Sequence, residues 1–135
     1  MTDLLGAWWL VECVSYCDGK GTPTFGTPPA GQLQYTADGR MGGFLMDPAW
    51  AERGDAKADS FTDFFAYGGT WTREGDMVRH LILFASVPGR VGTTFERVVR
   101  VVDRDTIVLE TVPEVSKSGK TYITRLPWKR VAAAG

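Results

Sequence analysis

The sequence predicts an all-β fold, an eight-stranded antiparallel up-and-down β-barrel with one short helix that covers an end. Apolar and polar residues alternate with period two in eight segments, which is typical of half-buried strands. Short turn sequences such as Ala37-Asp38-Gly39 and Glu74-Gly75-Asp76 separate several of them. Closure into a barrel would leave no unpaired strand edge, although the same strands could also fold as two packed sheets.

The predicted strands follow one another closely along the chain, so most sequence neighbours should pair as an antiparallel meander. They are 6–17, 31–36, 40–47, 67–73, 77–86, 93–102, 106–112 and 121–130.

Segment 48–66 interrupts this pattern. Ser60 and Asp63 have the spacing of a capping box, and three phenylalanines between 61 and 65 would share one face of a helix. We therefore expect a short amphipathic helix here. It would either plug one end of the core or act as a mobile lid over a ligand site.

Composition and charge narrow the class of protein. The chain has 135 residues, of which 44% are hydrophobic and 23% charged, as expected for one globular domain spanning residues 1–135. Its 15 basic and 16 acidic residues do not favour nucleic acid as a partner. The N-terminus carries Asp3 where a secretory signal would be basic, and no apolar run approaches the ~18 residues that cross a bilayer. We expect a cytoplasmic protein without a membrane partner.

Cys13 and Cys17 are the two cysteines, and His80 is the one histidine. On a straight strand the two cysteine Cα atoms would lie ~13 Å apart, too far for a disulfide. These residues match no familiar metal-ligand spacing, so we expect neither a metal nor another cofactor.

Strand alternation indicates which side chains face the barrel interior. In 93–102 alternation favours the odd positions, which include Phe95 and Arg97, as the inner face. In 77–86 both faces are apolar, which leaves His80 undecided and hints at a covered outer surface, such as a homodimer contact. The same reasoning gives Tyr35, Tyr67, Trp71, Phe95 and Tyr122 as expected ligand-binding residues, and we add Phe84, which shares the face of His80.

Several motifs resemble, in order and over nearly the whole chain, the short bacterial and fungal lipocalin-like domain proteins of calycin type. They are Leu4-Leu5-Gly6-Ala7-Trp8-Trp9-Leu10-Val11, Tyr35-Thr36-Ala37-Asp38-Gly39-Arg40-Met41, Tyr67-Gly68-Gly69-Thr70-Trp71, Val78-Arg79-His80, Val91-Gly92-Thr93 with Arg97, and Leu126-Pro127-Trp128-Lys129-Arg130. The resemblance implies an up-and-down barrel with a central cavity for a small hydrophobic molecule. It also implies a structural cation–π pair between Trp8 and Arg130 at the closed end. The residues printed here show neither the signal peptide pattern nor the disulfide cysteines of secreted lipocalins, so we do not expect extracellular transport.

If Trp8 points inward, as the resemblance implies, alternation carries Glu12 and Tyr16 inward as well, and Tyr16 joins the expected ligand-binding residues. An imidazole can move protons, and a guanidinium can hold a carboxylate or an enolate. We therefore expect His80, Arg97 and Glu12 to act on a carbonyl- or carboxylate-bearing molecule by cofactor-free acid–base chemistry, of the isomerase, cyclase, hydratase or lyase type. The alternatives are a non-catalytic binding or carrier protein, a histidine that is merely a core residue, and a Glu12–Arg97 ion pair that only fixes the barrel.

Overall fold

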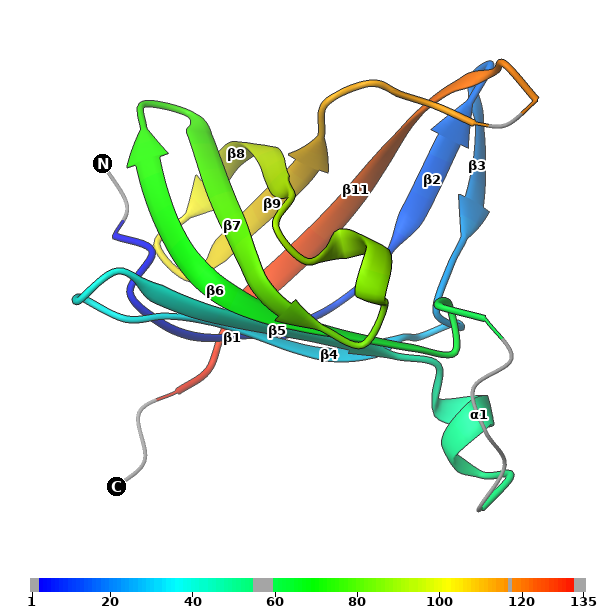
Figure 1. Cartoon of the computed structure of the whole chain (residues 1–135), viewed down its shortest axis with the longest axis horizontal. Coiled ribbons are helices and arrows are strands. Elements are labelled where there is room, and N and C mark those ends of the chain that lie inside the picture. Colours follow the sequence, from blue (N-terminus) through cyan, green and yellow to red (C-terminus); the bar gives the residue numbers. More distant parts are fainter. Residues whose placement is uncertain (1–2, 55–59, 117, 133–135) are drawn as a thin grey trace.

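The computed structural model describes residues 3–54, 60–116 and 118–132, and it shows a closed antiparallel barrel of eight strands (Figure 1). In their order around the barrel these are β1 (Gly6–Leu10), β4 (Ala30–Tyr35), β5 (Arg40–Met46), β6 (Phe64–Glu74), β7 (Met77–Ala85), β8 (Thr94–Asp103), β9 (Thr106–Thr111) and β11 (Thr121–Arg130). β11 pairs with β1, with Trp8 opposite Arg130, and this pairing closes the barrel. The structure therefore confirms the barrel and not the two packed sheets.

Three further strands extend the barrel wall at the other end of β11. β2 (Val14–Cys17) pairs with β11 and with β3 (Lys20–Pro23), while β10 (Glu114–Val115) pairs with the start of β11. The sequence pattern missed β3 and β10 because both are short and lack apolar alternation.

The break between β1 and β2 changes which side chains face inward. Leu10 lies opposite Trp128 and Val14 opposite Arg125, so the β1–β2 side has one more residue than β11 over this stretch. Such a bulge reverses the alternation. Glu12 is consequently exposed and Tyr16 is 39% exposed on the outside, and the expectation that both point inward is wrong.

A second irregularity, in the β6–β7 pairing, places Phe84 on the outside. Gly69 lies opposite Ile82, but its neighbour Gly68 lies opposite Phe84, so one residue of β7 is extra. The Phe84 ring lies over Gly68 and is 62% exposed. The inward position expected for Phe84 is therefore wrong for the same reason as that of Tyr16.

The short helix lies earlier than expected. It is α1 (Pro48–Ala51), and Asp47 caps it by accepting a 2.9 Å hydrogen bond from the Ala49 N–H. Ser60 to Asp63 form a turn instead of a helix, with the Asp63 N–H donating to the Ser60 carbonyl, and β6 begins directly afterwards at Phe64. Residues 55–59 of the expected lid or plug lie outside the described residues.

The closed end of the barrel is held by the Trp8–Arg130 contact. The guanidinium carbon of Arg130 lies 4.3 Å from the Trp8 ring centroid, and the guanidinium also donates to the carbonyls of Asp3, Leu5 and Arg104. Trp8 is fully buried. The expected cation–π contact is thus present, and it ties the N-terminal segment to the last strand.

In the described chain no helix is long and apolar enough to cross a membrane.

Candidate ligand-binding site

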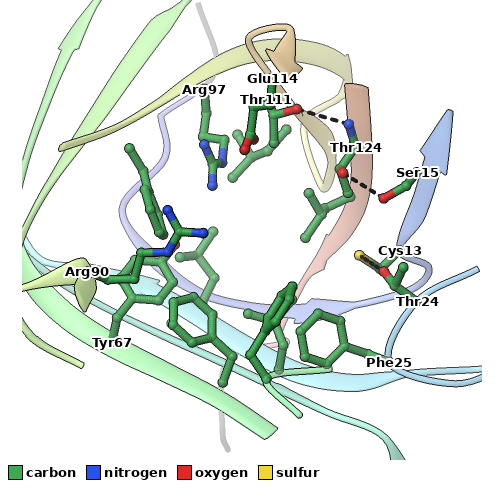
Figure 2. Close-up of a pocket in the computed structure, with 18 of the residues that line it drawn as sticks. Cys13, Ser15, Thr24, Phe25, Tyr67, Arg90, Arg97, Thr111, Glu114 and Thr124 are labelled. Carbon is green, nitrogen blue, oxygen red and sulfur yellow. Dashed lines mark hydrogen bonds between the residues drawn. The ribbon is translucent and has the colours of Figure 1, made fainter. Parts of the chain in front are cut away.

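A cavity of about 390 Å³ occupies the barrel above this closed end. Its apolar wall includes Phe25, Leu33, Leu45, Phe65, Phe95 and Leu126. In the view of Figure 2, Tyr67, Arg90 and Arg97 lie on one side of the cavity, and Cys13, Thr24 and Phe25 lie on the opposite side. An apolar cavity of this size with a few polar groups is the usual composition of a small-molecule site.

Arg97 brings a positive charge to the cavity wall. It lies on β8 opposite Val78, and its guanidinium stacks on Phe95 at 4.6 Å from the ring centroid and donates to the Glu96 carbonyl at 3.0 Å. Within the described residues it forms no ion pair with a carboxylate. The Glu12–Arg97 ion pair considered from the sequence is therefore not formed, since Glu12 is exposed and Arg97 lines the cavity.

Arg90 adds a second positive charge on the same side. It ends the short 3-10 helix η1 (Pro88–Arg90), and its guanidinium carbon lies 5.6 Å from the Phe95 centroid. Arg90 was not predicted from the sequence, because a loop residue has no strand alternation to indicate which way its side chain points.

Two lining glutamates offset these charges only in part. The Glu114 carboxylate accepts a 3.3 Å hydrogen bond from the Tyr122 hydroxyl, and the carboxylate of Glu96 is bound to Arg79. Burial and the neighbouring Glu114 raise the pKa of Tyr122.

His80 lies in the wall behind the cavity and not at its surface. It is fully buried, and its Nε2 lies 2.7 Å from the Tyr35 hydroxyl and its Nδ1 3.1 Å from the Tyr67 hydroxyl. Burial, with a further contribution from the positive charge of Arg97, lowers the pKa of His80 to about 3. The imidazole is therefore neutral at physiological pH, and of these three residues only Tyr67 lines the cavity.

The structure thus separates the residues expected from the sequence into three groups. The cavity is lined by Tyr67, Phe95, Arg97 and Tyr122. Next to it Tyr35 and His80 are buried, and the partly buried Trp71 packs against Tyr35 with 4.5 Å between the ring centroids. The outer surface carries Glu12, Tyr16 and Phe84.

Small polar side chains on the opposite wall were missed. The Thr24 hydroxyl donates to the Cys13 sulfur at 2.9 Å, and Ser15 and Thr124 share a 2.8 Å hydrogen bond. Burial raises the pKa of the Cys13 thiol. Thr124 could have been found because it shares the face of Tyr122 on β11, but Cys13 and Ser15 point inward only because of the bulge.

The cavity floor holds one buried donor without an acceptor. Trp128 lines the cavity and is 2% exposed, and its indole N–H has no hydrogen-bond partner in the part of the chain that the structure describes.

Across ranges 3–54, 60–116 and 118–132, no group of three or more His, Cys, Asp or Glu side chains is arranged to hold a metal ion.

Comparison with known proteins places the chain in a family. A search of the curated proteins finds no match. Among solved structures, a redesigned β-barrel aligns over 96% of this chain and 92% of its own, with 11% identity and a TM-score of 0.45. A family model described as a lipocalin-like domain matches residues 5–131. A lipocalin-like barrel suggests the binding of a small hydrophobic molecule. With a match over nearly its whole length and the closed barrel described above, the chain belongs to the lipocalin-like domain family.

Proposed function

We propose that the protein binds a small, largely hydrophobic molecule in its barrel cavity and that Arg97 holds a carboxylate or carbonyl oxygen of this ligand. The observation that carries the proposal is the position of the Arg97 guanidinium, which lines an apolar cavity without a carboxylate partner among the described residues. A guanidinium in such surroundings favours a planar acceptor that can take two parallel hydrogen bonds.

The rest of the cavity supports an apolar body for the ligand. Phe65, Tyr67 and Phe95 pack ring against ring, with centroid distances of 5.2 Å for both Phe65–Tyr67 and Tyr67–Phe95. A ligand that covers these rings would gain about 25 cal/mol of binding free energy for each Å² of apolar surface removed from water. Arg90 stands beside Arg97 and adds to the preference for an anion.

A pair of probes that differ in charge tests the proposal. Calorimetric titration with 2-naphthoate and with neutral 2-naphthamide should show tighter binding of the carboxylate. The substitution Arg97→Gln should weaken naphthoate binding by about tenfold or more and leave the amide nearly unaffected, because a charge-assisted hydrogen bond is lost.

Arg100→Gln is the matched control. Arg100 lies on the same strand but on the opposite face, where it pairs with Glu110 at 3.1 Å. Its substitution should not change the preference for naphthoate. Equal affinity of the wild type for both probes, or an equal loss in the two variants, would contradict the proposed role of Arg97.

Cofactor-free acid–base chemistry is a second candidate. It is favoured by the hydrogen-bonded chain Tyr67–His80–Tyr35, which starts at the cavity wall and continues into the core. The reaction would be an isomerisation, cyclisation, hydration or elimination of the bound carbonyl compound. Glu12 takes no part in it because it lies on the outer surface.

Incubation with a mixed metabolite extract distinguishes turnover from binding. Untargeted mass spectrometry should be applied to the extract and to the compounds released from the protein, for the wild type and for His80→Ala. A compound consumed only by the wild type would establish an enzyme. A compound retained unchanged by both proteins would establish a binding or carrier protein.

A further inference from the structure

We propose that the Tyr67 hydroxyl donates a hydrogen bond to the oxygen of the bound ligand and that His80 is the positioning residue that turns this hydroxyl hydrogen toward the cavity. The inference rests on the function proposed above and adds to it a second contact on the ligand oxygen besides Arg97. It also changes the role expected for His80, which would not touch the ligand.

His80 has fewer hydrogen-bond donors than it has hydroxyl neighbours. A neutral imidazole has one N–H and one lone pair, yet both ring nitrogens of His80 face a tyrosine hydroxyl. One tyrosine must therefore donate to His80, while the other accepts from it and keeps its own hydroxyl hydrogen for a different partner.

Burial decides which tyrosine keeps its hydrogen. Tyr35 is 1% exposed, and among the described residues its hydroxyl has no hydrogen-bond partner other than His80. If Tyr35 accepted from His80, its hydroxyl hydrogen would be buried without an acceptor, which is unfavourable. Tyr67 lines the cavity, where a ligand or water can accept its hydrogen. The favoured arrangement has Tyr35 donating to Nε2 and the Nδ1–H donating to Tyr67.

The two distances agree with this direction. The Tyr35–Nε2 distance of 2.7 Å is typical of a hydroxyl donor, and the Tyr67–Nδ1 distance of 3.1 Å is within the range of an N–H donor. The low pKa of His80 keeps the ring neutral, so that the count of one N–H holds at physiological pH.

Nitrogen-15 NMR tests the positioning role directly. Because His80 is the one histidine in the chain, its two ring nitrogens can be assigned without ambiguity in protein made without a histidine tag. We expect a protonated Nδ1 and an unprotonated Nε2 at neutral pH. The opposite tautomer, or a rapidly exchanging mixture, would overturn the inference.

The fluorescent naphthyl ketone Prodan tests the donor role. Its emission shifts to the red when its carbonyl accepts a hydrogen bond. Bound Prodan should show this shift with the wild type and lose it with Tyr67→Phe, which should also weaken binding about fivefold. Tyr16→Phe is the control because it removes the same hydroxyl from the outer surface, and it should behave as the wild type.

The outcomes separate this inference from the proposed function. Absence of Prodan and naphthoate binding to the wild type would refute the proposed function and the inference together. Binding of Prodan with a red shift that persists in Tyr67→Phe would refute the inference alone and leave the arginine site intact.

Discussion

Protonation of His80 should control the acid stability of the barrel. Its pKa is about 3 in the folded protein, mainly because burial disfavours the charged ring, and 6.5 is the ordinary value expected in the unfolded chain. Between these pH values the unfolded chain binds more protons, so the free energy of unfolding falls as the pH falls. At pH 4.5, two units below the unfolded pKa, the loss relative to pH above 7 is about 3 kcal/mol. This is a large part of the ~5–15 kcal/mol that stabilises a typical domain.

Urea denaturation of the wild type and of His80→Gln at pH 7.5, 5.5 and 4.5 measures this effect. The carboxylates titrate in both proteins, so the difference between the two pH profiles isolates the histidine. The wild type should be the more stable at pH 7.5, and its advantage should shrink by about 3 kcal/mol at pH 4.5. Parallel profiles would show that His80 is protonated equally in both states and would refute the argument from burial.

Three further predictions concern the barrel itself. Arg130→Met should lower the free energy of unfolding, measured by urea titration, by about 2 kcal/mol, because a cation–π contact and hydrogen bonds to three carbonyls are lost. Lys129→Met is the control on the exposed face of the same strand, and it should change this free energy by less than about 0.5 kcal/mol. Gly69→Ala should lower the free energy of unfolding by about 3 kcal/mol, because the added methyl group would collide with a backbone carbonyl of β7. Gly89→Ala should leave stability unchanged, because no atom lies within 4 Å of the added methyl group. Equal melting temperatures of the two variants would contradict this prediction. Cys13 should react with Ellman's reagent far more slowly than Cys17, because Cys13 is buried and its thiol has a raised pKa. Equal reaction rates of the two thiols would show that the cavity wall is open to the reagent.

The homodimer and the cytoplasmic location stay predictions. Leu81 and Leu83 are each 41% exposed on the outer face of β7, and Phe84 is more exposed still. Analytical ultracentrifugation of the wild type and of Leu83→Lys would test whether this face mediates self-association. A single monomeric species in both would contradict the expected dimer.

The order of strands followed from the sequence because it depends on local properties. Period-two alternation and short Gly- and Asp-containing turns depend on neighbouring residues, and seven of the eight barrel strands lie within a few residues of their predicted bounds. The predicted strand 6–17 was wrong in its extent, because β1 ends at Leu10 and β2 begins at Val14. The helix was misplaced because a capping-box spacing and an apolar face also fit the turn before β6. Here pairing of Phe64 with Met46 of β5 outweighs the local preference for a helix.

The residues of the site depended on features that alternation cannot show. Arg97 and Phe95 were correctly placed because β8 keeps an uninterrupted register with β7 around them, and Tyr67 and Tyr122 also line the cavity as expected. Glu12, Tyr16 and Phe84 were misplaced because one extra residue in a strand moves all following side chains to the other face.

Strand alternation and turn residues were enough to predict the fold class and an apolar interior that contains an arginine, and the family resemblance supplied the closed-end pair Trp8–Arg130. The folded structure was needed to show that His80 is a neutral, buried residue between two tyrosines and that Arg90 joins Arg97 at the cavity. The physical reason is that burial, pKa and hydrogen-bond direction depend on atoms from β4, β6, β7 and β8 together. Alternation along one strand indicates which side of the sheet a side chain lies on, but it does not indicate which residues of other strands that side chain contacts.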